Sequence, residues 1–326
     1  MSTLRFTGKA LAALAFLAAS AVIAAACSGG GGDGGDSAAI TEVTPVIVNS
    51  ELAVGENRFM VGLLSSENEE IVGAAVAFRF FKLDGDQKEL REEAQATPIA
   101  LEKTYTHTHE DGTVETHEAG ESGVYVATVR FDEPGQWRVE VTATVGDVTH
   151  DPADAGFDVL EESASVAMGA PAPLSETLTL DDVEDVAEID TSNPPIPEMH
   201  TMTIAEAVTS GRPSVIVFAT PAFCLSRICG PTKDIVDALF KQYKGEVNFV
   251  HVEPYELDRA RSGEGLFAVP ATTEWGLTSE PWVFLVDSEG NIAAKFEAAV
   301  VMGELTEALT PLLDDGDADS GSGIGY

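Results

Sequence analysis

The sequence predicts two folded parts of different class, an all-β part over residues 41–160 and an α/β part over residues 198–313. In the first range, short β-type runs alternate with turn residues, and no convincing helix lies among them. In the second range, strand-like and helix-like segments follow one another in the order β-α-β and then β-β-α. The predicted fold class is therefore multidomain, with an all-β sandwich followed by an α/β fold.

The first 26 residues have the features of a secretory signal peptide. Arg5 and Lys9 form a charged beginning, and an apolar and small-residue stretch runs from Leu11 to Ala26. At about 16 residues, this stretch is shorter than the roughly 20 residues of a bilayer-spanning helix. We therefore expect residues 1–26 to direct export.

Cys27 ends the sequence Ala24-Ala-Ala-Cys27. This pattern resembles the lipobox of bacterial lipoproteins, although Ala24 stands where that family usually has leucine. The resemblance implies a chain that begins at a diacylated Cys27 and is tethered to the membrane, outside the cytoplasm, by the Gly-rich linker of residues 27–40. Signal cleavage without lipidation is the alternative.

The chain carries a formal net charge of −37. Binding to nucleic acid requires a basic surface, so this charge argues against a nucleic-acid partner. The acidic residues are spread along the whole chain, which favours solubility. An exported protein meets oxidising conditions, so the expected compartment permits a disulfide.

The all-β part contains six β-type runs. In one of them, Trp137, Val139, Val141 and Ala143 alternate with polar residues, as in a half-buried antiparallel strand. Several such strands predict a small β-sandwich of the immunoglobulin-like type. The stretch 123–141 has a Gly-x-Tyr strand, a Pro-Gly turn and a Gly-x-Trp strand, and it resembles the last hairpin of the YtkA-like sandwich domains. The six runs begin at Pro45, Arg58, Ala74, Val124, Trp137 and Gly156.

Residues 161–197 are acidic and rich in proline and alanine, which predicts a mobile connector between the two parts. The α/β part then begins with a helix, because Thr203 and Glu206 form a capping-box pattern and Gly211 suits a helix end. Residues 314–326 are acidic and rich in glycine and serine, and they predict a disordered tail.

The remaining elements of the α/β part are four strands and two helices, with a hairpin turn between the last two strands. The predicted strands cover 214–218, 247–252, 282–286 and 292–297, and the predicted helices cover 231–243 and 304–312.

This part resembles the membrane-anchored, extracytoplasmic thioredoxin-like proteins. The matching features are a strand before two thiols, the Cys229-Gly-Pro231 sequence at a helix start, Pro281 directly ahead of the third core strand, and an Asp-x-x-Gly turn at 287–290. The resemblance implies a thioredoxin-like fold and thiol-disulfide exchange. It also implies protein thiols or disulfides as partners and no cofactor.

Cys224 and Cys229 are the thiols of this part, in a chain with three cysteines. Gly230 and Pro231 predict a helix start that leaves Cys229 just outside the N-terminus. Unpaired amides and the helix dipole at such a place favour a thiolate, which is the nucleophile in disulfide exchange. Arg227 lies between the cysteines and would add positive potential.

The spacing of the two thiols departs from the Cys-x-x-Cys of the family. On one helix, residues five positions apart point roughly 140° away from each other. A disulfide needs Cα atoms about 5.5 Å apart, so either Cys224 lies in a loop that folds back or the first turn of the helix opens. Cys229-Gly-Pro-Thr232 resembles the family's active-site tetrapeptide, with Thr232 in place of the second cysteine. Counting from the strand end at Phe218 instead favours Cys224, so the sequence leaves open which thiol attacks.

Other residues match or depart from the family. The acidic residue that the family often buries behind the thiols corresponds to about Val217, and its usual tryptophan is replaced by Phe223 or Ile228. Pro281 matches the family's cis-proline loop, with an ordinary trans proline as the alternative. Glu280 would then face the site, and its backbone would be placed to pair with an extended substrate chain.

Two other readings of the cysteine pair stay open. A fixed disulfide could staple a loop in an exported protein, and the fold would then serve as a scaffold for a binding or adaptor protein. Alternatively, Thr220-Pro221 followed by two cysteines separated by four residues resembles peroxiredoxins of the Q type, which implies peroxide reduction. Those enzymes also use an arginine near the peroxide, and the sequence does not identify one.

Three of the six histidines, His107, His109 and His117, fall in one polar segment. If Asp111-Gly112 forms a hairpin turn, His107 or His109 would lie across from His117, within reach of a copper or zinc ion. A copper-handling protein is therefore a further alternative, whereas a solvated polar ribbon needs no metal.

Two other histidines lie in the α/β part. His251 is on the strand after the thiol helix, and His200 is on the approach to this part. At such places we expect both to be structural.

Overall fold

The computed structural model describes residues 42–108, 114–224 and 228–317, and of these the side chains of 102–108, 114–121 and 314–317 stay outside the description. The predictions for the signal peptide, Cys27, Arg227, His109 and the end of the tail therefore concern residues outside the described ranges. Within these ranges, no helix combines the length and the apolar composition of a membrane span.

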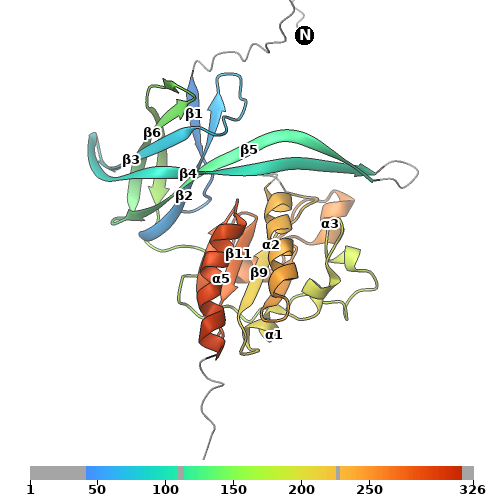
Figure 1. Ribbon diagram of the computed structural model, residues 1–326. Helices are drawn as coiled ribbons and strands as arrows, with labels where there is room; N and C mark the ends of the chain where they lie inside the picture. Colours follow the sequence, from blue (N-terminus) through green and yellow to red (C-terminus); the bar gives the residue numbers. More distant parts are fainter. Residues whose placement is uncertain (1–41, 109–113, 225–227, 318–326) are drawn as a thin grey trace, which may run out of the picture. The chain divides into compact units, whose positions relative to one another are not determined.

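The first part of the chain forms a sheet of eight strands in the order β1-β2-β5-β4-β3-β6-β7, with β8 also paired to β6 (Figure 1). All of these pairs are antiparallel. The strands are β1 (Val43–Ile47), β2 (Gly55–Ser65), β3 (Ala75–Asp84), β4 (Gln87–Thr108), β5 (Val114–Phe131), β6 (Gly135–Val145), β7 (Val148–Thr149) and β8 (Ala153–Val159).

The two ends of this first sheet meet around one apolar core. The backbone of Leu160, just after β8, exchanges hydrogen bonds with Leu52 and Val54, just before β2, at 2.8 and 2.9 Å. Phe59 is fully buried in the core and contacts four other phenylalanine rings, with centroids 4.9–6.5 Å away. Edge-to-face pairs of this kind add to the free energy gained by burying apolar area. The predicted β-rich character is confirmed, while the immunoglobulin-like type stays a prediction.

Two details of the first sheet differ from the sequence prediction. β4, with 22 residues, was not among the predicted strands, and it forms a long hairpin with β5 (Figure 1). The predicted hairpin over 123–141 is wrong, because β5 pairs with β2 and β4, whereas β6 pairs with β3, β7 and β8. The chain crosses between these strands at Gly135, whose φ of 105° favours glycine.

The segment 161–197 packs against the second part of the chain, so the predicted mobile connector is wrong for the described structure. Ala172, Ser175 and Asp190 are 5%, 1% and 2% exposed. Ala172 donates its backbone amide to Gly290 O at 2.9 Å, and the Ser175 hydroxyl accepts from Trp275 Nε1 at 3.2 Å. The amino-acid composition of this segment predicted mobility because the segment is acidic and rich in proline and alanine. The few buried residues, such as Ala172, Ser175 and Asp190, hold the segment against the second part of the chain.

The second part of the chain contains a four-stranded sheet in the order β10-β9-β11-β12. β9 and β10 are parallel, and β11 is antiparallel to both β9 and β12, as expected for the predicted order of elements. The strands are β9 (Ser214–Phe218), β10 (Asn248–Val252), β11 (Trp282–Val286) and β12 (Ile292–Glu297). The helices are η1 (Val186–Glu188), η2 (Pro197–His200), α1 (Ile204–Val208), α2 (Cys229–Tyr243), α3 (Leu257–Ser262), α4 (Pro270–Glu274) and α5 (Met302–Asp317).

Alternate residues of the buried strands face two different cores. Val215 and Val217 pack with α2 and α5, which lie on one face of the sheet (Figure 1). Ile216 and Phe218 pack with α1 and with Trp275 on the other face. This period-2 division explains why β9 and β11 are uninterrupted apolar runs.

The three predicted helices are present with shifted boundaries, and α5 covers Met302–Asp317 where 304–312 was predicted. Thr203 and Glu206 form the expected capping box at the start of α1. α2 begins at Cys229, with Ile228 as its N-cap, so Cys229 is the first residue of the helix and not the residue before it. The short helices α3 and α4, between β10 and β11, were not predicted.

We predict that Phe59→Ala lowers the free energy of unfolding of the first sheet by about 3–5 kcal/mol, because it opens a cavity among packed aromatic rings. Denaturant unfolding of the full chain measures the change. Val148→Ala is the control, because Val148 is 59% exposed on the same sheet. A cost below about 1 kcal/mol for Phe59→Ala would show that the core does not depend on this ring.

Candidate functional site

The two cysteines lie where the central strand β9 ends and α2 begins. All five residues of β9 are buried, and the chain leaves the sheet through residues 219–223 before it reaches Cys224. Strand ends of this kind place loop residues at the edge of the sheet, next to the first turn of the following helix. The local sequence therefore positions the thiols at a helix N-terminus.

Cys224 and Cys229 form a disulfide, with Cα atoms 6.0 Å apart. Cys224 lies in the loop before the helix, which is one of the two arrangements that the spacing allowed. Cys229 is 0% exposed, whereas Cys224 is half-buried. The backbone amide of Cys229 donates a hydrogen bond to Sγ of Cys224 at 3.2 Å. The helix N-terminus is thus directed at the sulfur of Cys224.

The first turn of α2 is tied to the loop that carries Pro281. The peptide bond between Glu280 and Pro281 is cis, as predicted from the position of the proline. Thr232, 1% exposed, donates its hydroxyl to Ala298 O at 2.9 Å, and the amide of Ala298 donates to Pro281 O at 2.8 Å. Gly230 has open space around the position of a Cβ atom. These hydrogen bonds fix the proline loop relative to α2, while the space next to Gly230 at the helix start stays open.

The carboxylate of Glu280 lies beside the disulfide, as predicted. One of its oxygens and the sulfurs of Cys224 and Cys229 all lie within 4.8 Å of one another. Glu280 is 9% exposed, and Tyr255 donates its hydroxyl to Glu280 Oε2 at 2.5 Å. Burial and the hydrogen bond to the Glu280 carboxylate raise the pKa of Tyr255. Val217 is buried and apolar, so the acidic group near the sulfurs comes from the proline loop and not from the strand.

One basic residue close to the cysteines, Lys233, is buried in α2. Lys233 is 1% exposed and forms an ion pair with Asp237, one turn further along α2. Its Nζ atom also lies 3.9 Å from Sδ of Met199. The charge of Lys233 is therefore largely balanced within its own helix, and Arg227 lies outside the described residues.

The polar hairpin with three histidines is only partly described. In the β4–β5 register, His107 lies opposite Glu115, and His117 lies opposite Tyr105. The two histidines are thus two positions apart along the paired strands. Their side chains and the whole of His109 lie outside the description, so the copper or zinc site stays a prediction.

A buried polar cluster that the sequence did not reveal holds the loop before Cys224. His251 Nε2 donates to Ala219 O at 3.0 Å, and the amide of Ala222 donates to Thr191 Oγ1 at 3.1 Å. Thr191 in turn donates to Glu253 Oε1 at 2.5 Å. Burial raises the pKa of Glu253. These partners come from segments far apart in sequence, so spacing alone gave no signal for them.

The first sheet contacts the helix start next to the cysteines. Ile228, the residue before Cys229, packs in an apolar cluster that joins the first sheet to residues 298–301. The other members of this cluster are Val48, Met60, Ile99, Leu101, Val124, Val126, Ala298, Ala299 and Val301.

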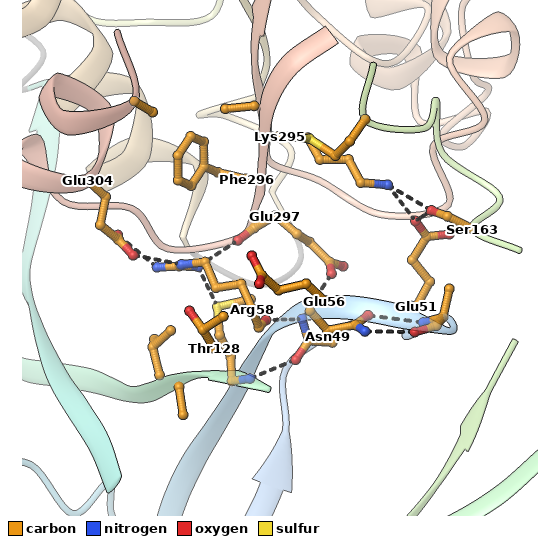
Figure 2. Close-up of a pocket in the computed structure, with 18 of the residues that line it drawn as sticks. Asn49, Glu51, Glu56, Arg58, Thr128, Ser163, Lys295, Phe296, Glu297 and Glu304 are labelled. Carbon is orange, nitrogen blue, oxygen red and sulfur yellow. Dashed lines mark hydrogen bonds and ion pairs between the residues drawn. The ribbon is translucent and has the colours of Figure 1, made fainter. Parts of the chain in front are cut away.

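Polar contacts between the two parts of the chain surround a cavity of about 1280 Å³. Figure 2 shows that Arg58 forms a two-bonded pair with Glu304, at 2.8 and 2.9 Å. Glu297 accepts from the amide of Ser50 at 2.7 Å and from the hydroxyl of Ser279 at 3.0 Å. Ser279 directly precedes Glu280, so these contacts hold the proline loop as well.

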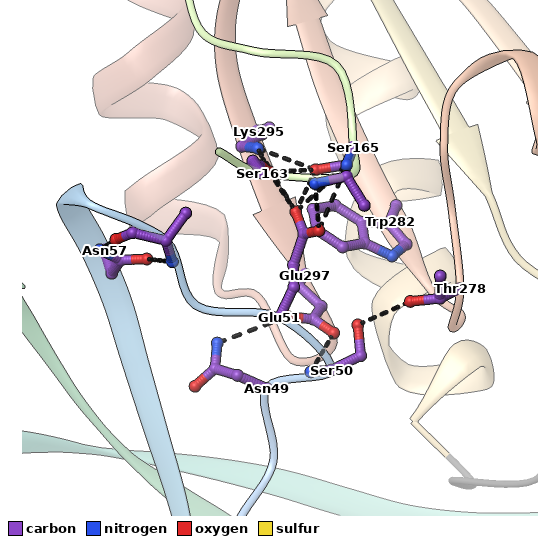
Figure 3. A network of polar contacts seen from close by, with 12 residues as sticks. Asn49, Ser50, Glu51, Asn57, Ser163, Ser165, Thr278, Trp282, Lys295 and Glu297 are labelled. Atoms are coloured by element: carbon purple, nitrogen blue, oxygen red, sulfur yellow. Dashed lines mark hydrogen bonds and ion pairs between the residues drawn. The ribbon is translucent and has the colours of Figure 1, made fainter. Parts of the chain in front are cut away.

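A second set of contacts in the same region centres on Glu51, as Figure 3 shows. Its carboxylate accepts the backbone amides of Ala164 and Ser165, at 2.8 and 3.2 Å, and lies 3.7 Å from Lys295 Nζ. Burial opposes the charge of Glu51, but hydrogen bonds from Ser163 and Ser165 and the charge of Lys295 lower its pKa. Burial outweighs the hydrogen bonds that Glu297 accepts from Ser50, Ser279 and Asn49 and raises its pKa.

Comparison with known proteins gives only distant structural likenesses. No protein-family model matches the sequence, and no curated protein matches it. Among solved structures, the chain is similar to a thiol:disulfide interchange protein of the thioredoxin family from Chlorobium tepidum TLS, with 16% identity and a TM-score of 0.28. The match covers 46% of this chain and 99% of the other. Because these values are low, the reaction proposed below rests on the geometry of the two cysteines.

We predict that Glu297→Gln and Glu51→Gln change the pH dependence of stability in opposite directions. A raised pKa means that the folded state loses stability as pH rises from the usual value of 4.5 through the folded pKa of Glu297. Glu297→Gln removes that loss, so its melting temperature relative to the wild type should rise by roughly 2–4 °C between about pH 4.5 and pH 8.

For Glu51 the pKa is lowered, so its stabilisation is present above the usual value of 4.5 and is lost as pH falls through the folded pKa. Glu51→Gln should therefore be less stable than the wild type at pH 8 and approach it in acid. Melting curves of the full chain across this range provide the measurement, with exposed Glu289→Gln as the control. The same trend in both variants would contradict the assignment.

We also predict that Glu280→Gln makes the reduced thiols more reactive. The Glu280 carboxylate lies close to both sulfurs, and a nearby negative charge disfavours a thiolate. Removing that charge should increase the rate of iodoacetamide alkylation at pH 7 by roughly fivefold. Exposed Glu264→Gln is the matched control. An unchanged or lower rate would show that the carboxylate does not act on the thiols.

Proposed function

We propose that the chain performs thiol-disulfide exchange through Cys224 and Cys229. The observation that carries the proposal is the hydrogen bond from the amide of Cys229, at the start of α2, to Sγ of Cys224. An amide of a helix N-terminus directed at a sulfur stabilises that sulfur as a thiolate. The bond between the two sulfurs then forms and breaks as the protein exchanges electrons with a partner.

Burial and hydrogen bonding favour Cys224 as the attacking thiol. Cys224 is half-buried and accepts the hydrogen bond of the helix, whereas Cys229 is 0% exposed. In the exchange reaction, the attacking sulfur lies in line with the disulfide bond of the partner. The attacking sulfur must therefore be accessible from the surface of the protein. Cys229 is therefore assigned the second step, which is internal and needs no access.

In the reducing direction, the Cys224 thiolate attacks one sulfur of the partner disulfide, and the other partner sulfur leaves as a thiolate. The resulting mixed disulfide is then attacked by the Cys229 thiolate, which forms the Cys224–Cys229 bond and releases the second partner sulfur. Two electrons pass from the protein dithiol to the partner. The reverse sequence oxidises a partner dithiol.

The surroundings of the disulfide support docking of an extended protein segment. Gly230 leaves open space at the helix start, and the loop of Glu280 and Pro281 borders the same sulfurs. A chain lying between them would pair its backbone with the loop, as in other cases of strand addition. Protein thiols or disulfides are thus the proposed substrates.

The proposed site of action is outside the cytoplasm. Support for this comes from the sequence of residues 1–27, with its apolar segment and lipobox-like ending at Cys27. A lipid on Cys27 would tether the reaction to the membrane surface. Labelling with a lipid precursor in a bacterial host, compared with Cys27→Ser, tests this part independently of the redox chemistry.

The decisive experiment traps the mixed disulfide. In a Cys27→Ser background, Cys229→Ser removes the resolving thiol and Cys224→Ser removes the attacking one. With glutathione disulfide, Cys229→Ser should form a stable adduct about tenfold faster than Cys224→Ser, because only Cys224 is accessible and activated. Mass spectrometry of the intact chain measures both rates.

Equal rates in the two variants would overturn the assignment of Cys224 as the attacking thiol. The redox titration of the protein that keeps both cysteines gives a separate test. A midpoint potential below about −300 mV, with no reduction of a model protein disulfide, would identify a fixed staple instead of an exchanging pair.

A metal-handling function is the second candidate, because the two sulfurs and the Glu280 carboxylate converge within 4.8 Å. In the reduced protein, two thiolates at this place would favour a soft ion such as Cu(I). Titration of the reduced chain with Cu(I) tests the idea against Cys224→Ser. Binding no tighter than micromolar would remove it.

A further inference from the structure

A second convergence of side chains lies apart from the disulfide, in the interior beside β10. Asp190 follows η1, His200 ends η2, and His251 is in β10, so three separate segments bring them together. They are 2%, 1% and 2% exposed. One oxygen of Asp190, Oδ2, lies 3.0 Å from His200 Nε2 and 3.4 Å from His251 Nδ1.

The orientation of His251 is set by its other nitrogen. His251 Nε2 must carry a proton, because it donates to the carbonyl of Ala219 at 3.0 Å. His251 Nδ1 is buried and has no hydrogen-bond partner among the described residues, although it faces the Asp190 carboxylate. A neutral ring would direct a lone pair at a carboxylate oxygen, so the arrangement calls for a cation between them, which is either a proton on Nδ1 or a metal ion. Metal-bound histidines commonly donate their second nitrogen to a backbone carbonyl in this way.

The carboxylate of Asp190 is oriented in the same manner. Its Oδ1 atom accepts the amide of Ser192 at 2.7 Å, which leaves Oδ2 for both imidazoles. A charged carboxylate and a neutral imidazole are the forms that bind a metal ion.

The distances fit a small ion with four ligands. Ligand atoms held about 2.0–2.1 Å from a tetrahedral zinc ion stand roughly 3.3 Å from one another. The distances of 3.0 and 3.4 Å from Asp190 Oδ2 to the two ring nitrogens are close to this value. The three ligand atoms all lie within 4.8 Å of one another.

The cluster can be reached from a cavity of about 850 Å³, which both imidazoles line. The cavity wall is acidic, which raises the local concentration of cations. Its acidic residues are Glu176, Asp182, Glu188, Glu253, Glu256 and Asp258, and Arg259 is a basic residue of the same wall. A water molecule from the cavity would complete the four ligands.

We propose that Asp190, His200 and His251 form a binding site for a divalent transition-metal ion of the zinc type, separate from the two cysteines. The ion is bound by Asp190 Oδ2, His200 Nε2 and His251 Nδ1. Because His251 also holds the carbonyl of Ala219, the bound ion fixes the start of the loop that leads to Cys224.

The test is a titration of the EDTA-treated full chain, with its disulfide intact, by Zn²⁺ and by Co²⁺. One equivalent of Zn²⁺ should bind with a dissociation constant below about 1 μM and raise the melting temperature by about 5 °C. The Co²⁺ complex should show a four-coordinate visible spectrum without a thiolate charge-transfer band. Asp190→Asn keeps the size of the side chain and should weaken Zn²⁺ binding about 100-fold.

Three controls decide whether these residues hold the ion. Asp182→Asn changes the cavity wall but not the cluster and should bind normally. The double variant Cys224→Ser, Cys229→Ser and the double variant His107→Ala, His117→Ala should also keep full affinity. Loss of binding in either double variant, or full affinity in Asp190→Asn, would overturn the proposal.

Two outcomes concern the unmodified chain and do not depend on a folded variant. The absence of any equivalent bound more tightly than about 10 μM would identify a proton-linked cluster without a metal. If Asp190→Asn fails to fold, NMR of the Co²⁺ form decides. Two paramagnetically shifted imidazole N–H signals, one protected from exchange by the bond to Ala219, support the site, and their absence removes it.

Discussion

The site depends on one geometric constraint, the reversal of the chain between β9 and α2. Five positions separate Cys224 from Cys229, and their Cα atoms lie 6.0 Å apart. Such a bond cannot form within one regular helix, so Cys224 must lie in a loop that returns to the helix start. That return brings the sulfur of Cys224 to the amide of Cys229, where a helix stabilises negative charge. Spacing, burial and reactivity therefore have the same origin.

The sequence predicted the second part of the fold almost element by element, because its strands are continuous apolar runs and its first helix has a capping box. It failed where composition and structure disagree. β4 is long but charged, so it lacks the apolar alternation of a half-buried strand. The segment 161–197 is acidic overall, yet Asp190 and its neighbour Ile189 are buried. The conformation of β4 and that of the segment 161–197 depend on tertiary partners, which local sequence patterns do not encode.

For the site, the sequence predicted the residues that lie next to the cysteines along the chain or belong to the proline loop. Glu280 was found because it precedes Pro281, and the structure places its carboxylate beside the sulfurs. Tyr255, which donates to that carboxylate, was not predicted because α3 and α4 separate it from Glu280 in sequence. His251 was expected to be only structural. His251 lies next to Asp190, which belongs to the segment 161–197. The sequence predicted a mobile connector there, so it gave no reason to expect this contact.

Ile228 and Ser279, which precede Cys229 and Glu280, both contact the first part of the chain. Ile228 packs among apolar side chains of the first sheet, while Ser279 contacts Ser50 at 3.0 Å. When the disulfide is reduced, the covalent link between loop and helix is lost, but these contacts do not involve sulfur. In the proposed exchange, in which the sulfur–sulfur bond opens and closes, these contacts would hold Ile228 and Ser279 in place.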